Sequence, residues 1–579
     1  MEPPEPTAAA FSTADVEKPV ATSRRRPGLF AIWIMSSVVL FAMIGLWSLA
    51  TPLYAGPDEG VQVIRAVSLL RGELAGPAAP GKSLPVVAAR VPRPYAEAVA
   101  LPRCFMFRPW RSAGCAPRFP SGGGGLVSTT TYVGHYPPLY YALVGTPSYF
   151  LPPVQAVLAM RMLSDLVSAA ALGLAFAIAG TWSSSVLLPA GLAVSVTPMA
   201  IFLGGMVNPS GMEISLAVLC WTAALVVATV PDRAPPVGLL RVLGVAASLL
   251  AVTRFASPLW VACVGLVLLA LTPPARLAAL ARSRPAIRWA AAVIGAASAC
   301  AVWDVATRAF LVTPAGPKAT GSTAHVVEQS AVYVASLAEE VVGVLGWLDT
   351  RAPFAVYVAW IAVAVAIVAA GAALGSKRGR TVLVGLVLAG LTIPTAMVAS
   401  HARQQGLWLL QGRDVLPLLV GLPLTAAVVA GQKHRRLSSV LGSVAVGAVW
   451  ACLLVFFAEA LRRYTVGVNG PLDPLVRVTG GWTPPLGAAT LLFSFTLADG
   501  AYLALGLALT RAAYRPAAAA ERRLDDDPDG PGAGPDAPTP HSPAADAASP
   551  SEGWQYGGGA VSRPGGRGLG GVRRMSAPG

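Results

Sequence analysis

Residues 29–50 read LFAIWIMSSVVLFAMIGLWSLA, an uncharged and mostly apolar run that decides the fold class. About 20 apolar residues suffice to cross the roughly 30 Å hydrocarbon core of a bilayer as a helix, which satisfies its own backbone polar groups. Arg24, Arg25 and Arg26 precede the run, which is too long for the core of a signal peptide. We therefore expect an anchor helix here, with the N-terminus in the cytoplasm.

Similar apolar runs recur along the chain. Of its 579 residues, 55% are hydrophobic and 12% charged, and the mean hydropathy of +0.61 excludes an ordinary soluble protein. We expect an all-α integral membrane protein with about twelve transmembrane helices. After the first, the expected helices lie near residues 154–180, 184–203, 210–230, 237–252, 255–272, 287–312, 353–375, 381–400, 414–431, 437–461 and 485–511.

The charges of the loops predict the orientation of these helices, because basic loops favour the cytoplasmic side. When the helices are threaded alternately, four basic loops fall inside with Arg24, Arg25 and Arg26. These loops carry Arg233; Arg276, Arg282, Arg284 and Arg288; Lys377, Arg378 and Arg380; and Lys433, Arg435 and Arg436. Both termini are then cytoplasmic. The abundance of Arg, Ala, Gly and Pro suggests a GC-rich bacterial genome, so the membrane we expect is a bacterial plasma membrane.

This threading divides the chain into three parts. Residues 1–28 form a disordered cytoplasmic N-terminus, and residues 29–511 form the membrane domain. Two long loops, 51–138 and 313–352, lie outside the cytoplasm, and we expect short interfacial helices in the first, including one near residues 61–74. Residues 512–579 are rich in Pro, Gly, Ala, Asp and Ser, which predicts a disordered cytoplasmic tail.

The net charge of +15 does not indicate a nucleic-acid partner, because the arginines lie in short loops rather than in one patch. The Arg- and Gly-rich end of the tail, residues 563–574, is better explained as a solvated segment. Among six cysteines, Cys104 and Cys115 share the first outer loop, where a disulfide and two free thiols both remain open.

Polar residues near the apolar runs gather at their outer ends. An ionisable residue at the centre of a bilayer costs about 2.5 to 3.5 kcal/mol, so such residues indicate a function or a pairing. The set comprises Asp58, Glu59, His135, Arg161, Asp165, Asn208, Arg254, Asp349, Arg351, Arg403, Gln411, Arg413 and Asp414. Their common side predicts a polar cavity that opens outward.

Several of these residues also have a purely structural explanation. Arg161 and Asp165 lie four residues apart and can pair on one helix face. Asn208, followed by Pro209, suits the N-cap of a helix. Arg413 and Asp414 can be interfacial anchors. These explanations do not account for the gathering of the polar residues on one side of the membrane.

Adjacent carboxylates at Asp58 and Glu59 suggest the chemistry of such a cavity. A carboxylate can act as a general base on an acceptor hydroxyl, or hold a divalent cation such as Mg²⁺ or Mn²⁺ against a phosphate, with Asp58 as the candidate ligand. Arginine complements a phosphate through forked donors. Tyr136, in a Tyr- and Pro-rich stretch, offers an aromatic surface for a sugar ring.

An ordered series of motifs resembles a family of bacterial multi-pass membrane proteins, the domain-of-unknown-function family 2142, which is grouped with membrane glycosyltransferases of the GT-C type. The resemblance covers about residues 50–430. Its pieces are Gly56-Pro57-Asp58-Glu59 with Arg65, His135-Tyr136-Pro137-Pro138-Leu139-Tyr140-Tyr141, Arg161-Met162-Leu163-Ser164, Asn208-Pro209, Gly346-Trp347-Leu348-Asp349 and Gln411-Gly412-Arg413. This chain departs from the family pattern at Arg254, where Lys is usual, at Asp414, where an aromatic residue is usual, and in lacking a His after Glu59.

The resemblance implies transfer of a sugar from a polyprenyl-phosphate donor in the lipid to an envelope glycan outside the cytoplasm. It implies catalytic roles for Asp58 and Glu59, and contacts of Arg161, Arg254 and Arg413 with the lipid phosphate. Further candidates for substrate binding are Tyr136 and Trp347 at the sugar, and Arg65, His135, Asn208, Asp349 and Gln411. A transporter or flippase of lipid-linked glycans and a non-catalytic envelope assembly protein remain the alternatives.

Overall fold

The computed structural model describes residues 28–82, 85–123, 125–230, 235–310, 317–406, 410–431, 434–473 and 479–526, with side chains up to Tyr514 in the last helix. The chain divides into a compact unit, 1–521, and a second unit, 522–579. The terminal segments predicted to be disordered are 1–28 and 512–579. Of these the structure describes only residue 28 and residues 512–526, and the latter are helical where disorder was expected; the rest lies outside the described residues. The predicted inward-facing Arg24, Arg25, Arg26, Arg233 and Lys433 lie outside them as well.

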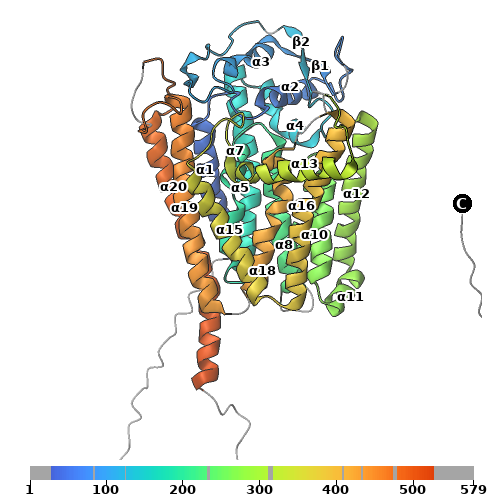
Figure 1. Cartoon of the computed structure of the whole chain (residues 1–579), viewed down its shortest axis with the longest axis vertical. Coiled ribbons are helices and arrows are strands. Elements are labelled where there is room, and N and C mark those ends of the chain that lie inside the picture. The colour runs from blue at the N-terminus through green and yellow to red at the C-terminus, as the bar shows by residue number, and fades with distance from the viewer. Residues whose placement is uncertain are drawn as a thin grey trace, which may run out of the picture. The chain divides into compact units, whose positions relative to one another are not determined.

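The first unit is built around long apolar helices (Figure 1). Nine helices of the described residues are long and apolar enough to cross a membrane, so the expectation of a helical membrane protein is confirmed. They are α1 (Leu29–Leu49), α5 (Pro153–Trp182), α8 (Pro209–Thr229), α12 (Arg284–Thr307), α15 (Phe354–Leu374), α16 (Lys377–Gln405), α17 with α18 (Gly412–Leu419 and Gly421–Ala430), α19 (Arg435–Thr465) and α20 (Ala488–Asp526). The last helix continues beyond its predicted end at 511.

Three of the twelve expected spans are short or broken in the structure, so the total of twelve membrane-crossing helices stays a prediction. Two are the short helices α9 (Val237–Ala251) and α10 (Ser257–Leu271), and the third is split into α6 (Leu188–Ser195) and α7 (Pro198–Gly204). Pro198 cannot donate a backbone hydrogen bond within a continuous helix. The side chain of Thr197 instead caps α7 by accepting a hydrogen bond from Ala200.

Helix α8 forms the centre of the bundle and is buried inside the protein along its apolar stretch. It packs against α5, α9 and α10, while α1 lies along α5. Apart from Glu213 and a few hydroxyl-bearing residues its side chains are apolar, and they cover all its faces, as expected of a helix with no lipid-facing side. Small residues bring other pairs close: a Cβ at Gly371 of α15 would lie 2.8 Å from Cα of Ala426 in α18.

The two long loops, whose predicted place is outside the cytoplasm, each contain short elements. The first contains α2 (Glu59–Leu70), α3 (Arg93–Ala98), α4 (Leu139–Val144), the 3₁₀ helices η1 (Leu101–Cys104), η2 (Ala113–Cys115) and η3 (Thr146–Tyr149), and an antiparallel pair of strands, β1 (Val87–Pro92) and β2 (Leu126–Thr131). The second contains α13 (Thr323–Ser336) and α14 (Ala338–Gly343). In Figure 1 the elements of the first loop gather at one end of the bundle.

The first loop differs in part from its prediction. Helix α2 confirms a helix near 61–74, whose interfacial position stays a prediction, but the expectation of helices alone missed the two strands. Cys104 and Cys115 form a disulfide, which decides the alternative that the sequence left open. The other four cysteines are buried and free.

Candidate functional site

Asp58 occupies a turn between α1 and α2 that exposes its carboxylate. Its backbone adopts the left-handed conformation, with φ of 60° and ψ of 5°, which Asp tolerates better than most residues. It precedes α2 at the N-cap position, but its side chain makes no capping hydrogen bond. The carboxylate is therefore free to bind groups outside its own helix.

Two side chains from distant parts of the sequence hold Asp58. Its Oδ2 accepts a hydrogen bond from Nη2 of Arg413, in the first turn of α17, and its Oδ1 accepts one from the hydroxyl of Tyr132 at 2.5 Å. The side chain of Asp58 is 23% exposed and that of Arg413 is 9% exposed. The carboxylate thus lies at an opening, with a nearly buried guanidinium behind it.

The pKa of Asp58 reflects this environment. Burial alone raises it, but the charge of Arg413, the hydrogen bonds from Tyr132 and Arg413, and the charge of Arg254 outweigh burial. The pKa of Asp58 therefore lies below its ordinary value of 3.8, and the carboxylate stays ionised at neutral pH.

Arg254, in the turn between α9 and α10, extends this network. Its Nη1 donates to Oε2 of Glu213 in α8 at 2.9 Å, and its Nη2 donates to Oδ1 of Asp414 at 3.0 Å. The centre of the Tyr136 ring lies 6.0 Å from the guanidinium carbon of Arg254. Electrostatic contacts join this group to Arg413. We call Asp58, Arg413, Arg254, Asp414 and Glu213 the charged cluster.

Glu59, next to Asp58, points into the protein instead. Nε and Nη2 of Arg161 donate to its two carboxylate oxygens at 2.6 Å each, and both side chains are fully buried. The remaining donors of Arg161 bond to the backbone carbonyls of Ser48, Thr51 and Pro52 at 2.8 to 2.9 Å. All five guanidinium N–H groups are therefore used. This pair ties the end of α1 to α5 and leaves no donor for a substrate.

The alternative that Arg161 pairs with Asp165 is wrong. Asp165 is fully buried one turn further along α5, and its two carboxylate oxygens have no hydrogen-bond partner among the described residues. Glu59 offers Arg161 two parallel hydrogen bonds, a geometry that a carboxylate one turn away on the same helix cannot provide.

Four other residues singled out from the sequence support the backbone around the charged cluster. Asn208 caps α8, as predicted, and its amide donates to the carbonyl of Pro57 at 2.9 Å, which helps to fix the Asp58 turn. Arg65 donates to three backbone carbonyls, among them that of Tyr136. A ring nitrogen of His135 lies 3.0 Å from the carbonyl oxygen of Gly76. The backbone N–H of Gln411 donates a hydrogen bond to the carboxylate of Asp414.

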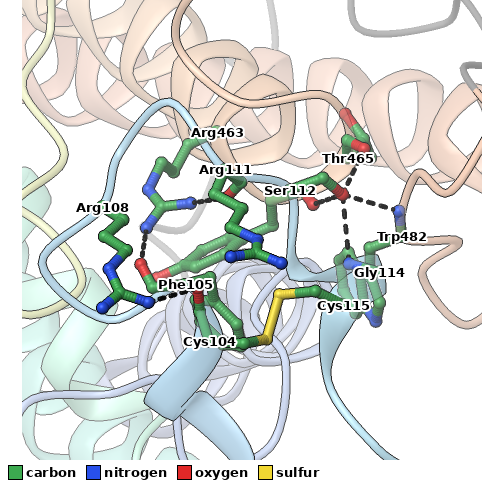
Figure 2. The surroundings of a disulfide bond; sticks show 11 residues. Cys104, Phe105, Arg108, Arg111, Ser112, Gly114, Cys115, Arg463, Thr465 and Trp482 are labelled. Atoms are coloured by element: carbon green, nitrogen blue, oxygen red, sulfur yellow. Dashed lines mark hydrogen bonds between the residues drawn. A yellow bond between two sulfur atoms is a disulfide. The ribbon is translucent and has the colours of Figure 1, made fainter.

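Asp349 and Trp347 belong to a second group, next to the disulfide. Nη2 of Arg463 donates to Oδ2 of Asp349 at 3.0 Å and to the carbonyl of Phe105 at 2.8 Å. The ring of Trp347 packs edge-on against Phe107. Figure 2 shows Arg463 beside the loop that the disulfide between Cys104 and Cys115 closes. The structure thus brings Asp58, Arg254, Arg413 and Tyr136 together, and places Asp349 and Trp347 in a different contact group.

Two hollows are lined by residues that contact or closely follow members of the charged cluster, although no member of the cluster lines either one. The first, which we call the outer pocket, has a volume of about 650 Å³ and is lined by β2 residues, α3, Arg103 and Tyr132, the partner of Asp58. The second, which we call the membrane groove, has a volume of about 610 Å³ and is lined almost entirely by apolar side chains of α6, α13, α14, α15, α16, α17 and α18. Val415 and Leu416 line it, two and three residues after Arg413.

The residues near Asp58 do not fit the divalent cation expected from the sequence. No group of three or more His, Cys, Asp or Glu side chains in the described part of the chain is arranged to hold a metal ion. Both Asp58 oxygens already accept hydrogen bonds, and both Glu59 oxygens are bound by Arg161. We therefore derive no step that passes through a metal.

Sequence reasoning missed three partners in the site. Glu213 was detectable, because it is an acidic residue inside the apolar run 210–230 and such residues are costly in lipid. Arg463 was also detectable, since an arginine at the outer end of a span opposes the usual charge bias. Tyr132 carried no such signal, because a tyrosine in a polar loop is common.

Comparison with known proteins gives one match. The family model described as a predicted membrane protein (DUF2142) matches residues 41–422, a range that includes the whole charged cluster. No curated protein and no solved structure matches the chain.

Proposed function

The chain belongs to the DUF2142 family of predicted membrane proteins, and we propose that it is a membrane glycosyltransferase of the GT-C type. In this proposal it moves a sugar from a polyprenyl-phosphate donor to an envelope acceptor outside the cytoplasm. One observation carries the proposal. A partly exposed, ionised carboxylate is held against the guanidinium of Arg413, and the residues that follow Arg413 in α17, Val415 and Leu416, line an apolar groove between membrane-spanning helices.

The membrane groove suits the hydrocarbon chain of such a donor. Its lining on α15 runs from Trp360 to Ala372, which corresponds to about 18 Å of helix. An apolar chain gains nothing by leaving lipid for a polar site, so a groove lined by Val, Leu and Ala is the surface that it can occupy. The donor phosphate would then lie near Arg413, at the start of α17.

Arg413 has the donors that a phosphate requires. Its Nε and Nη1 are buried and have no partner among the described residues, while Nη2 binds Asp58. A guanidinium binds phosphate through two parallel N–H groups, and each such pair in Arg413 includes Nη2. A phosphate would therefore bind Nη2 together with Nε or Nη1, and would compete with Asp58 for Nη2. Arg254 lies within electrostatic reach and adds positive charge.

Charge balance links phosphate binding to the state of Asp58. The charged cluster holds three carboxylates and two guanidinium groups, so an incoming phosphate must compete with a carboxylate for a cation. Asp58 is the competitor at the opening. When the phosphate takes a share of Arg413, the pKa of Asp58 rises because its cation is shared, and Asp58 becomes a better base.

The proposed reaction is a substitution at the anomeric carbon of the sugar. The acceptor hydroxyl oxygen forms a bond to this carbon, and the bond from the carbon to the phosphate oxygen breaks. The phosphate oxygen keeps the electron pair, and the hydroxyl proton passes to Asp58 and then to water. Arg413 offsets the charge that develops on the leaving polyprenyl phosphate. Glu59 and Arg161 would keep the Asp58 turn in place without touching the substrate.

Deletion of the gene tests the proposal, with mass spectrometry of envelope glycans and of lipid-linked sugars. We expect one glycan to lose a sugar and one polyprenyl-linked sugar to accumulate, and expect wild-type protein, but not the Asp58→Asn variant, to reverse both changes. Unchanged glycans and lipid-linked sugars in the deletion strain would contradict the proposal. Full reversal by Asp58→Asn at equal membrane level would remove Asp58 from the reaction.

A further inference from the structure

The loop closed by the disulfide between Cys104 and Cys115 is basic and aromatic. Residues 101–123 contain four arginines and no acidic residue. The four arginines, Arg103, Arg108, Arg111 and Arg118, are all exposed. Phe107 and Trp110 lie among them and are 61% and 57% exposed. Large apolar side chains this exposed often mark an interaction surface. We call Arg103, Phe107, Arg108, Trp110, Arg111 and Arg118 the basic loop.

The basic loop is held firmly although its side chains face outward. Figure 2 shows the disulfide at its base, Arg463 donating to the carbonyls of Phe105 and Arg111, and Ser112 bound to Thr465 and Trp482. The backbone of Phe107 has a φ of 58°, which is costly for a large side chain. A loop ordered in this way loses little conformational entropy when it binds a partner.

The outer pocket connects the basic loop to the proposed reaction centre. Arg103 belongs to both the basic loop and the outer pocket, and Tyr132, which also lines the pocket, donates a hydrogen bond to Asp58. The pocket wall between them carries the β2 threonines Thr129, Thr130 and Thr131. A polymer bound on the basic loop can therefore extend into a pocket whose wall includes Tyr132, the hydrogen-bond partner of Asp58.

From this arrangement we propose that the basic loop and the outer pocket bind the acceptor, and that the acceptor is an anionic glycan. This inference rests on the proposed function, because it names the substrate that receives the sugar. The arginines match the negative charge of the polymer, and the flat faces of Phe107 and Trp110 suit the apolar faces of sugar rings. The outer pocket mixes aliphatic side chains with the hydroxyl groups of Thr129, Thr130 and Thr131, which can hydrogen-bond a hydroxyl-rich glycan. It also contains Glu97, so we assign recognition of the negative charge to the arginines of the basic loop.

Binding to the purified full-length protein in lipid discs of neutral lipid tests this. The two probes are carboxymethyl-dextran and unmodified dextran of equal length, which differ only in charge. We expect carboxymethyl-dextran to bind more tightly and to weaken as salt rises. The triple variant Arg103→Ala, Arg108→Ala, Arg111→Ala should bind it about tenfold more weakly, since each exposed ion pair contributes modestly. The matching lysine variant should retain most of the binding.

Controls make the outcome decisive. The triple variant Arg282→Ala, Arg284→Ala, Arg288→Ala removes the same charge from exposed positions outside the loop and should bind like wild type. Thiol labelling checks that the disulfide remains closed in every variant. Equal binding by both alanine variants would overturn the proposal. So would loop-dependent binding to vesicles of anionic lipid without binding to carboxymethyl-dextran.

The same assay separates the failure of this inference from that of the proposed function. The Asp58→Asn variant should bind carboxymethyl-dextran normally, because binding does not need the reaction. Loss of binding only in the loop variant supports the acceptor site whether or not transfer is detected. Normal transfer with normal binding in the loop variant rejects the acceptor site and leaves the proposed function intact.

Discussion

Replacing Glu59 by Gln tests whether the buried pair with Arg161 holds the site together. The substitution keeps the shape of the side chain but removes its charge, and leaves the Arg161 guanidinium fully buried without an anion. Two hydrogen bonds of 2.6 Å lose their ionic acceptor, and the new amide N–H group faces other donors. Breaking a buried ion pair from one side costs about 3 to 5 kcal/mol. We expect a loss of that size in the free energy of unfolding.

The assay is reversible unfolding in mixed detergent micelles, followed for Glu59→Gln, Arg161→Gln and the double variant. The pair should show a coupling energy of about 3 kcal/mol, because the second substitution removes the charge stranded by the first. Glu328→Gln, at a side chain that is 77% exposed on α13, serves as the control and should change little. A coupling energy below about 1 kcal/mol would refute the reasoning that this pair is a buried clamp.

Three further predictions concern the groove, the loop and pH. Ala364→Trp fills the membrane groove and should raise the KM for a long-chain polyprenyl donor but not for a short-chain one. Ala362→Trp, outside the groove, should change the KM for neither donor. An equal rise in KM for both donors in Ala364→Trp would count against the groove. Cys104→Ser opens the short loop that the disulfide closes, and this closure contributes about 3 kcal/mol to stability. Trypsin added outside oriented vesicles should therefore cut at Arg108 or Arg111 faster than in wild type. An unchanged cleavage rate would show that the other contacts hold the loop without the disulfide. Because the pKa of Asp58 lies below 3.8 in the folded protein, its pairing adds to the free energy of unfolding above pH 3.8, and this contribution disappears as the pH falls through the lower, folded-state pKa. The free energy of unfolding of wild type should therefore exceed that of Asp58→Asn by a constant margin from pH 7 to about 5, and the margin should vanish in acid. A margin that persists in acid would contradict the pairing.

The sequence predicted the long apolar helices because apolar runs carry that signal locally. It also singled out Asp58, Arg254 and Arg413, which lie in one network although up to 355 positions separate Asp58 from Arg413. The same reasoning also selected Arg161 and Asp349, which pair elsewhere, so it found members of the network without separating them from other buried charges. The resemblance to a known family pointed to the same residues.

The sequence could not predict which partner each charge takes, because that depends on how the helices are rotated against one another. Arg161 had an acid one turn away at Asp165 and a distant one at Glu59, and only the packing of α1 on α5 decides between them. The strands of the first loop were missed for a related reason. Leu126–Thr131 alternates in burial only once it is paired with Val87–Pro92.

Transfer of labelled sugar by purified protein in lipid discs tests the central claim most directly. The donor is a polyprenyl-phosphate sugar, the acceptor is envelope glycan, and the compared proteins are wild type, Asp58→Asn and the exposed control Glu328→Gln. The Asn variant keeps a residue that tolerates the left-handed backbone at position 58. We predict that wild type and Glu328→Gln transfer equally and that Asp58→Asn is slower by about 10²-fold or more, as expected when a base is lost. Transfer by Asp58→Asn at the wild-type rate would contradict the account.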